Sequence, residues 1–363
     1  MITSIYIHIP FCEHICSYCD FSKVFYQKEL VDKYLESLKN EISQIPKDHW
    51  YQTIYIGGGT PSSLNMDQLT KLFSLLADIN LAKNYEFTIE CNIENITTEK
   101  LKLFKKNRVN RLSIGVESFN NAKLTFLERN YHYDDIKPKI KLAKKLGFQN
   151  INIDLMYALP GETLNDMKEE LNQFLSLNIN HVSIYSLIIE DHTKLGIQQL
   201  KPIDEELDRQ MYDLINQELI KHGYIHYEIS NFCLPGYQSQ HNITYWRNQP
   251  YYGLGLGASG YIGKIRYTNT KSINRYLEGK YRHEETYINS VQDRENEIML
   301  GFRTIEGISK IKFKEKFKKN LEEFYNIDWL LKKQILISDP EKYYIHPKYW
   351  YILNEILVKF IGE

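Results

Sequence analysis

Residues 4–21 read SIYIHIPFCEHICSYCDF, and this short stretch contains both a predicted strand and a dense group of cysteines. The apolar, β-branched run at 4–9 predicts a strand that is buried in a sheet. Cys12, Cys16 and Cys19 follow that strand with the spacing CxxxCxxC. Thiolates at such short spacing can surround one compact inorganic centre. The sequence therefore predicts a metal or iron–sulfur site at the end of the first strand.

Two kinds of metal centre are compatible with this cysteine group. Three thiolates leave one iron of a [4Fe–4S] cubane without a protein ligand. Structural zinc needs four closed ligands, so it would have to recruit His8 or His14, and the chain would then be a zinc-stabilised interaction protein. The pattern favours the cluster, because no second cysteine pair follows at zinc-finger spacing. The isolated Cys91 and Cys233 are expected to be small buried hydrophobic residues.

Similar apolar runs recur farther along the chain and alternate with segments that carry apolar residues at helical spacing. The further predicted strands cover residues 53–57, 86–91, 111–115, 151–157 and 181–186. Repeated strand–helix alternation, in strands without a clean polar face, predicts a parallel sheet that is covered on both faces. The expected fold class is α/β, with a partial (β/α)6 barrel similar to a TIM barrel.

Glycines and polar residues gather near the ends of the predicted strands. GGGTP, at residues 57–61, follows the second strand, while Glu90, Glu117 and Asp154 lie in or just after the next three. Strand ends meet at one mouth of such a barrel, where its active sites lie. Glycines have no side chain, so a ligand can approach their backbone closely. The carboxylates can accept hydrogen bonds from ribose hydroxyls, and Arg129 can pair with a carboxylate of the ligand. This mouth suits a ligand with an amino group, a carboxylate and a ribose.

The strand–helix alternation fades after about residue 195. The pattern then predicts a helix at 205–221, a strand at 224–230 and a glycine-rich passage at 251–263. From about residue 291 it is mostly helical, with one short strand at 343–346. We expect three parts, namely a core domain at 1–230, a glycine-rich connecting segment at 231–285 and a small, mostly helical α+β domain at 286–363.

The composition is typical of a soluble globular protein. Hydrophobic residues make up 43 % and charged residues 25 % of the chain, and the formal net charge is −1 at pH 7. This balance argues against broad nucleic-acid binding, and no apolar run is long enough to span a bilayer. The N-terminal residues lack the features of a secretory signal, so we expect a cytoplasmic protein.

The stretch HNITYW contains a second group of polar and aromatic residues, His241, Asn242, Tyr245 and Trp246. An imidazole, an amide and a phenol beside an indole can hold an aromatic ligand or a metal. The same side chains can equally form a satisfied polar network next to a turn. The residue types alone do not decide between these two interpretations.

The chain resembles the radical S-adenosylmethionine (SAM) superfamily, and within it the group of oxygen-independent coproporphyrinogen III oxidase with its HemW-like haem-chaperone branch. The likeness rests on an ordered series of motifs, YIHIPFCEHICSYCDF, YIGGGTPSSL, TIECN, RLSIGVESF, LERNYH, INIDLMYALPGET, YEISNF, HNITYWRNQPYYGLGLGASGY and ENEIMLGFRTIEGI. The series covers nearly the whole chain. It implies that 1–230 is a radical SAM core domain and that 286–363 is a HemN-type C-terminal domain.

By this resemblance, Cys12, Cys16 and Cys19 hold a [4Fe–4S] cluster, and SAM binds beside it. The SAM site that the resemblance implies consists of Tyr6, Tyr18, Gly58, Gly59, Thr60, Glu90, Glu117, Arg129 and Asp154. Glu117 stands where the family usually has Gln, and a carboxylate cannot donate a hydrogen bond as an amide does. The chemistry of the family is reduction of the cluster, cleavage of SAM to a 5′-deoxyadenosyl radical and hydrogen abstraction, but the sequence assigns no catalytic residue.

Two features place the chain in the chaperone branch by resemblance. Phe21 stands where the oxidases have a further Cys, and the cluster motif begins almost at residue 1, without the N-terminal extension of the oxidases. HNITYW resembles the haem-binding motif HNxxY, so His241 is the candidate axial ligand, together with Tyr245.

The implied function is that of a chaperone that binds haem as cargo and delivers it to soluble haemoproteins or, in transient contact, to membrane haemoproteins. The alternative is oxidative decarboxylation of coproporphyrinogen III to protoporphyrinogen IX, or radical chemistry on another tetrapyrrole. The sequence names neither the acceptor nor the electron donor. It also leaves open whether SAM is cleaved.

Overall fold

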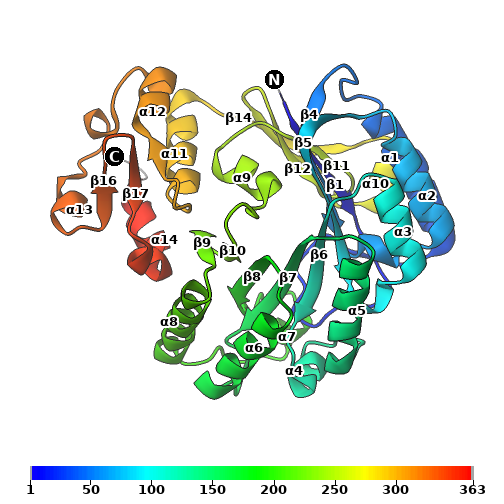
Figure 1. Cartoon of the computed structure of the whole chain (residues 1–363). Helices are drawn as coiled ribbons and strands as arrows, with labels where there is room; N and C mark the ends of the chain where they lie inside the picture. Colours follow the sequence, from blue (N-terminus) through cyan, green and yellow to red (C-terminus); the bar gives the residue numbers. More distant parts are fainter. Residues whose placement is uncertain (1, 361–363) are drawn as a thin grey trace.

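The computed structural model describes residues 2–360 and is built around a nine-stranded sheet in the order β11-β1-β4-β5-β6-β7-β8-β10-β9 (Figure 1). Six neighbouring strands of this sheet run parallel. They are β1 (Ser4–Ile9), β4 (Trp50–Gly58), β5 (Asn80–Asn92), β6 (Arg111–Glu117), β7 (Asn150–Tyr157) and β8 (His181–Ser186). These strands are the six that the sequence predicts, so the expected partial (β/α)6 architecture is confirmed.

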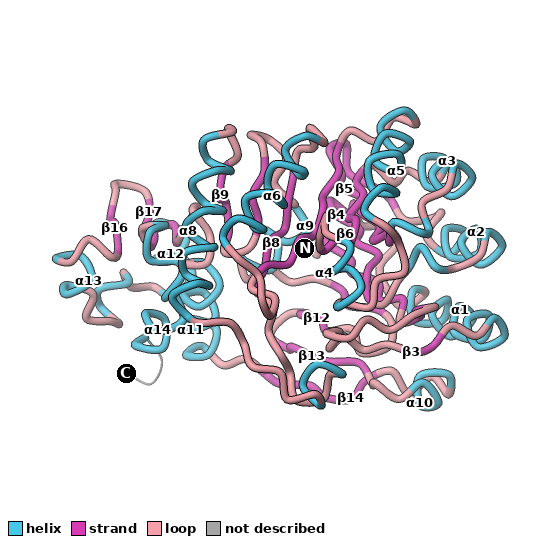
Figure 2. The backbone as a smooth tube through the Cα atoms, turned by 90° about the horizontal axis from the view of Figure 1, so that it is seen from below, coloured by secondary structure: helices cyan, strands magenta, loops and turns pink. Residues whose placement is uncertain are grey.

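Helices lie around the outside of the curved sheet, most of them between successive parallel strands of the chain (Figure 2). They are α1 (Lys28–Ile42), α2 (Met66–Leu75), α3 (Thr98–Lys106), α4 (Asn121–Phe126), α5 (Tyr133–Lys145), α6 (Leu164–Ser176), α7 (Lys194–Ile197) and α8 (Glu205–Lys221). Side-chain caps determine where several of them begin. Asn65 with Gln68, and Thr163 with Asp166, form capping boxes that satisfy the first free N–H groups of α2 and α6.

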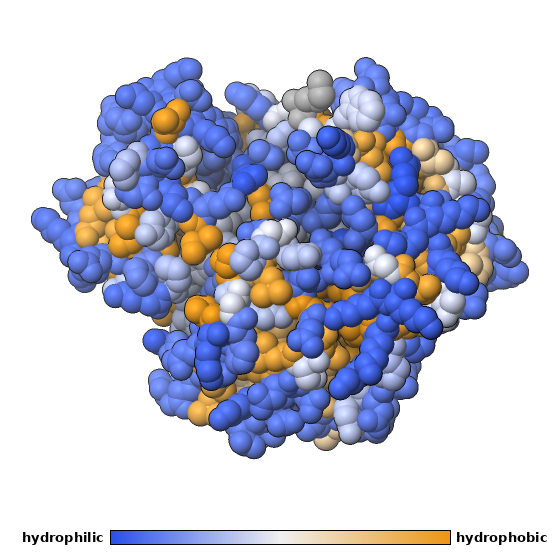
Figure 3. Space-filling view, in the orientation of Figure 1, coloured by the Kyte–Doolittle hydropathy of each residue, from blue (hydrophilic) through white to orange (hydrophobic). Residues whose placement is uncertain are grey.

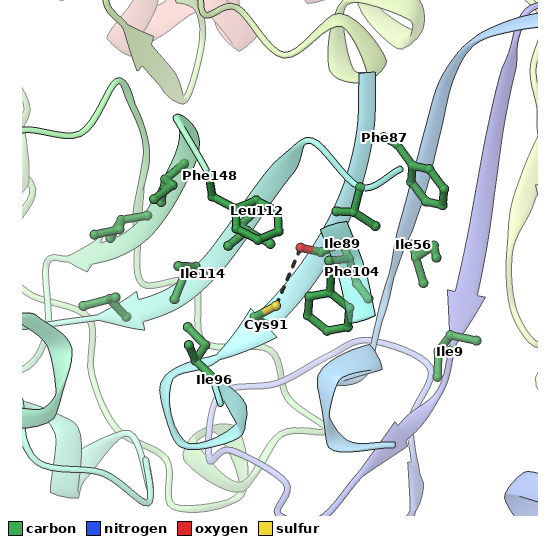
Figure 4. Close-up of a cluster of buried hydrophobic side chains, with 14 of the residues drawn as sticks. Ile9, Ile56, Phe87, Ile89, Cys91, Ile96, Phe104, Leu112, Ile114 and Phe148 are labelled. Carbon is green, nitrogen blue, oxygen red and sulfur yellow. Dashed lines mark hydrogen bonds between the residues drawn. The ribbon is translucent and has the colours of Figure 1, made fainter. Parts of the chain in front are cut away.

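The parallel strands are buried on both faces, as predicted, but their two faces differ in chemistry. Alternate residues pack beneath the helices and are apolar, among them Ile5, Ile7, Ile54, Ile56, Ile89, Leu112, Ile114, Ile151 and Ile153 (Figure 4). The residues between them are largely polar and equally buried, including Ser4, Thr53, Thr88, Arg111, Ser113, Asn152 and Ser183. Since side chains alternate along a strand, this polar set faces the barrel interior. The interior is thus a polar compartment.

The sheet extends beyond the six parallel strands at both edges. β11 (Tyr252–Leu254) pairs in parallel with β1, while β10 (Asn231–Cys233) pairs antiparallel with β8 and with β9 (Ile225–Glu228). The strand predicted at 224–230 is confirmed over residues 225–228, but it ends earlier than predicted, because the chain turns at residues 229–230. The Glu228 carboxylate accepts the N–H of Ser230, and Ile184 N–H donates to the Ser230 carbonyl (2.8 Å). These bonds hold the turn.

The remaining elements lie near the N-terminus and in the C-terminal part of the chain. They are β2 (Phe11–Cys12) and β3 (Val24–Phe25) near the N-terminus, followed late in the chain by α9 (Gln240–Trp246), β12 (Ser259–Ile262), β13 (Ile265–Asn269), α10 (Ile273–Leu277), β14 (Arg282–Tyr287), α11 (Ser290–Gly301), β15 (Ile308–Ser309), α12 (Lys310–Phe317), α13 (Asp328–Lys332), β16 (Leu336–Ser338), β17 (Lys342–Ile345) and α14 (Leu353–Leu357). A separate hydrophobic cluster, with Trp350 fully buried, lies within residues 298–360. The predicted domain boundaries at 230 and 285 stay a prediction.

The surface is mainly hydrophilic on the face drawn in Figure 3, where apolar side chains gather around α4 to α7. Within residues 2–360 no helix is both long enough and apolar enough to cross a membrane.

One buried carboxylate ties the glycine-rich passage to the barrel. Glu41, near the end of α1, accepts hydrogen bonds from Gly255 N–H (2.8 Å), Asn269 Nδ2 (2.7 Å) and the Tyr276 hydroxyl (2.7 Å). Burial raises the pKa of Glu41, and these donors oppose the shift. Because Gly255 follows β11, this contact helps to hold β11 against β1.

We predict that Glu41→Ala lowers the melting temperature by roughly 5 °C or more, because it leaves several buried donors without an acceptor. Glu36→Ala on the same helix is the matched control. Glu36 is exposed and pairs only with Lys71, so its loss should shift the melting temperature by less than about 1 °C. Calorimetric scans of both variants test this. Equal melting temperatures would show that the Glu41 contacts do not stabilise the fold.

Candidate functional site

The carboxyl ends of the parallel strands surround a cavity of about 440 Å³. It brings together most of the residues predicted for a cofactor site, namely Cys12, Cys16, Tyr18, Cys19, Gly58, Gly59, Thr60, Glu90, Glu117, Arg129 and Asp154. These residues come from positions up to 142 apart in sequence, counted from Cys12 to Asp154. Parallel strand pairing explains the convergence, since it places equivalent strand ends at one edge of the sheet.

The cysteine loop leaves β2 and lines one side of this cavity. Thr60 Oγ1 donates to Cys12 Sγ (3.6 Å), and Arg129 Nη1 donates to Cys16 Sγ (3.4 Å). Burial raises the pKa of the Cys12 thiol to about 11, with the Thr60 hydrogen bond opposing, and burial also raises the pKa of Cys16. Over the described residues, no three His, Cys, Asp or Glu side chains converge closely enough for a single metal ion. All three thiols nevertheless line the cavity.

The glycine run at the end of β4 packs against its neighbours more tightly than the sequence suggests. A Cβ at Gly57 would lie 2.8 Å from Glu90 Oε1, and one at Gly59 would lie 2.8 Å from both Cys12 Sγ and the Pro10 carbonyl oxygen. Gly58 has a φ of 122°, which favours glycine. From the sequence, these glycines are expected to let a ligand approach the backbone. The structure adds that they let the cysteine loop lie directly against β4.

Two carboxylates face the cavity from β5 and β7, the strands on either side of β6. Glu90 on β5 accepts from the Tyr55 hydroxyl (2.8 Å) and from Gly58 N–H (2.9 Å). Asp154 on β7 accepts from Asn152 Nδ2 (2.8 Å). Burial raises the pKa of Glu90 to about 7 and also raises the pKa of Asp154. Both groups can accept further hydrogen bonds from a ligand.

In this structure the Arg129 guanidinium is already paired with side chains of the protein. Its Nη2 donates to Glu117 Oε1 (2.7 Å), and its Nη1 lies 3.4 Å from Asn92 Oδ1. From the sequence, Arg129 is expected to pair with a carboxylate of the ligand. The partner seen here belongs to the chain itself.

Several buried polar atoms around the cavity have no hydrogen-bond partner among residues 2–360. They are Arg111 Nε, Glu117 Oε2, Arg129 Nε and Asn231 Oδ1. Buried polar groups are rarely left unpaired, so these atoms indicate a polar ligand. Three carboxylates and two guanidinium groups line the cavity. A net cationic ligand such as SAM, which carries a sulfonium, an ammonium and a carboxylate, fits this arrangement.

Sequence reasoning missed some polar residues of the cavity, namely Asn92, Arg111, Ser113, Asn152, Ser183 and Asn231. Most lie at alternate positions of predicted strands. A polar residue at every second position of an otherwise buried strand was the signal that could have found them.

Tyr6 lies deeper in the barrel than the other predicted SAM-site residues and is not among the residues that line the cavity. Its hydroxyl is hydrogen-bonded to His8 Nδ1 (2.9 Å). Its ring centroid lies 6.1 Å from that of Tyr55 and 6.4 Å from that of His241. Tyr6 therefore belongs to an aromatic layer beneath the cavity.

His241 belongs to the same layer. On α9 it is 1 % exposed, with Nδ1 hydrogen-bonded to Thr53 Oγ1 (2.7 Å) and Nε2 to the Tyr245 hydroxyl (2.6 Å). Burial lowers its pKa to about 3, so the ring is neutral. Of the HNITYW group, Asn242 reaches the cavity, whereas His241 and Tyr245 do not. In this conformation His241 and Tyr245 are hydrogen-bonded, whereas the buried Trp246 Nε1 has no partner among residues 2–360.

The two isolated cysteines are buried in hydrophobic clusters, as expected. Cys91 lies among core side chains that include Ile89, Ile96 and Ile114 (Figure 4). Cys233 is fully buried beside Tyr227 and Ile243. Burial raises the pKa of both thiols to about 12.

Comparison with known proteins gives two kinds of match. The model of the radical SAM superfamily matches residues 6–174. The haem chaperone HemW of Lactococcus lactis is 41 % identical over 99 % of this chain and 97 % of its own length. HemW of Bacillus subtilis is 38 % identical over 99 % of both chains.

A solved structure shares the fold across nearly the whole chain. It is the radical SAM enzyme coproporphyrinogen III oxidase (HemN) of Escherichia coli, with a TM-score of 0.86 over 99 % of this chain and 90 % of that one. The two sequences are 20 % identical, so this likeness concerns the fold.

Proposed function

The chain belongs to the radical SAM superfamily and, within it, to the family of the haem chaperone HemW, and we propose that it binds haem as cargo and delivers it to haemoproteins from the cytoplasm. The observation that carries this proposal is the 41 % identity to a haem chaperone, which extends over 97 % of that chaperone. Cluster motif, SAM residues and HNITYW all lie within this match. The acceptors we propose are soluble haemoproteins and, by transient contact, membrane haemoproteins.

Membership of the superfamily implies a [4Fe–4S] cluster and SAM. When bound, these groups supply one-electron chemistry in which SAM is the source of a deoxyadenosyl radical. We propose that Cys12, Cys16 and Cys19 hold the cluster. The hydrogen bonds from Thr60 to Cys12 and from Arg129 to Cys16 stabilise negative charge on the sulfur atoms and orient the thiolates.

We propose that SAM lies across the strand ends that face the cysteine loop. Glu90 and Asp154 accept hydrogen bonds from the ligand, and Gly58, Gly59 and Thr60 present backbone to it. Tyr18 and Arg129 close the cavity on the side of the cysteine loop, and Tyr6 supports it from below. The unpartnered Arg111 Nε and Glu117 Oε2 support a polar occupant at this position.

Cys16→Ala should abolish the cluster, whereas Cys91→Ala should retain about four irons per chain after anaerobic reconstitution. Cys91 is the matched control, because it is a buried thiol that packs in the core. Iron, zinc and sulfide analysis of both proteins checks the assignment. A Cys16→Ala protein with full iron content would contradict the assignment. Zinc without iron in the parent would favour the alternative that the chain is a zinc-stabilised interaction protein.

We further propose that His241 and Tyr245 form part of the haem site. A neutral imidazole is a common haem ligand, and burial keeps this one neutral. Because both ring nitrogens are hydrogen-bonded, Nε2 must exchange the Tyr245 hydroxyl for iron. The buried position also requires α9 to move away from β4. Two kinds of contact hold α9 in place. The hydroxyls of Thr244 and Ser4 are hydrogen-bonded (3.1 Å), and the Glu86 carboxylate accepts the Gln240 and His241 N–H groups at the start of the helix.

We predict that the parent binds haem with one haem per chain and that His241→Ala weakens its affinity at least about tenfold and alters its absorption spectrum. His222→Ala is the control, because His222 is exposed at the end of α8. Titrations followed by absorbance, with circular dichroism to check folding, measure both. If the His241→Ala protein matches the parent in spectrum and affinity, the haem ligand lies elsewhere.

The competing function is decarboxylation of coproporphyrinogen III. Phe21, which stands where the oxidases have a Cys, lines the cavity and is 70 % exposed at its mouth. We predict that the reconstituted protein with SAM and reductant forms no protoporphyrinogen above a control that lacks the protein. Chromatography of the anaerobic reaction checks this. Protoporphyrinogen formed in a SAM-dependent way would identify the chain as an oxidase.

A further inference from the structure

The helix that carries His241 is fixed at both of its ends by other parts of the chain. At its start, the Glu86 carboxylate of β5 accepts the Gln240 and His241 N–H groups (3.0 Å each). At its end, Asn248 adopts the left-handed conformation with a φ of 50°, and its N–H donates to the Tyr245 carbonyl (2.9 Å). Asn248 therefore closes α9 and belongs to the end of the helix.

The side chain of Asn248 is buried, and both sides of its amide are bound by groups outside α9. Its Nδ2 donates to Asp293 Oδ1 (3.0 Å) and to Glu297 Oε2 (3.3 Å), one turn apart on α11, which lies beside α9 (Figure 1). Its Oδ1 accepts from Arg266 Nη2 of β13 (2.7 Å). Lys316 of α12 donates to the same two carboxylates (2.9 and 2.8 Å), so the acid pair is itself held in place.

A second contact joins the end of α9 to the chain beyond α11. Arg247 Nε donates to Glu306 Oε2 (2.9 Å) and Arg247 Nη2 donates to Glu306 Oε1 (2.8 Å), which makes a two-point ion pair. Residues 303–305, just before Glu306, are hydrogen-bonded to the end of β9. The end of α9 is thus tied to the central sheet through the C-terminal part of the chain. We call the bonds of the Asn248 amide and the Arg247–Glu306 pair the α9 latch.

The α9 latch acts on the helix that covers the candidate haem ligand. His241 is buried against Thr53 of β4, so haem reaches it only when α9 moves away from β4. Because Asn248 belongs to the end of α9, a movement of the helix as a unit withdraws its amide from α11 and β13. The latch contacts are then made only while His241 is covered. Contacts made only in one conformation lower the population of the other.

We propose that the α9 latch regulates the proposed haem site, with Asn248 as a positioning residue that keeps His241 covered until α9 is released. The proposal rests on the proposed haem site at His241. It gives α11 and α12 a role in haem binding, although neither helix carries a candidate haem ligand. Opening of α9 then limits haem binding, and a weaker latch raises both the rate and the affinity.

Asn248→Gly tests the latch, because glycine keeps the left-handed backbone and removes only the side-chain amide. Asn178→Gly is the matched control, since Asn178 has the same conformation (φ 49°) in the same position after α6, and its side chain is exposed. Two measurements compare these variants with the parent. They are hydrogen exchange by mass spectrometry without haem, and the rate constant of haem binding by stopped-flow absorbance.

In Asn248→Gly we expect hydrogen exchange in α9 to be about fivefold faster than in the parent, because the latch no longer opposes opening. Exchange in α2, far along the sheet, should not change. Haem should bind faster by about the same factor. Asn178→Gly should leave both the exchange of α9 and the rate of haem binding at their parental values.

Each other result has a definite meaning. If exchange accelerates equally in α9 and α2, Asn248 stabilises the whole fold and the latch is wrong. If α9 alone exchanges faster while haem binds at the parental rate, the latch does not regulate haem binding, although the haem site stands. If the parent binds no haem, the proposed haem site itself fails, whereas the exchange data still show whether Asn248 holds α9.

A second variant covers the case in which Asn248→Gly folds poorly. Glu306→Gln breaks only the partly exposed ion pair with Arg247, so it should leave the fold intact. We expect a smaller acceleration, of about twofold, in the exchange of α9 and in haem binding. Parental values of both quantities in Glu306→Gln would show that the Arg247 contact is no part of the latch, and parental values in both variants would overturn the proposal.

Discussion

The parallel pairing of β1 with β4 is the constraint on which the site depends. Its register places His8 opposite Gly57 and Ile9 opposite Gly58, so the chain leaves β1 directly beside the glycine run. Only bare backbone at Gly59 allows the cysteine loop to lie as close as it does. The same parallel arrangement brings the carboxylates of β5, β6 and β7 to this edge. Cysteines and polar side chains therefore meet in one cavity.

Beneath the cavity, the barrel interior is filled with aromatic and imidazole rings instead of a hydrophobic core. The Tyr55 hydroxyl binds Glu90 above, while its ring stacks on His241 below, with centroids 5.1 Å apart. Tyr55 therefore lies between the proposed SAM cavity and His241, the haem-ligand candidate. The proposed haem and SAM sites are therefore neighbours, and a movement of α9 that exposes His241 would also disturb the floor of the cavity.

The sequence predicts the helices and strands well, because their patterns are local. It predicts contacts between residues far apart in the chain poorly. β1, β8 and α8 have the predicted bounds, because apolar periodicity is local. The turn at residues 229–230 was missed, because the bonds that hold it include one from Ile184. One hydrogen-bond partner of His241 is Thr53, 188 residues away, so the burial of His241 could not be predicted from its neighbours in sequence. The Glu117–Arg129 pair likewise depends on the positive φ of Glu117, which no local sequence pattern indicates.

The central claim is that the cluster and SAM occupy one cavity at the strand ends. Three thiolates leave one iron without a protein ligand, and that iron is where SAM would bind. The most direct test is the electron paramagnetic resonance spectrum of the reduced, reconstituted cluster before and after SAM is added. The account predicts that saturating SAM changes the g values of the cluster. A spectrum that stays the same while calorimetry shows SAM to be bound would contradict it.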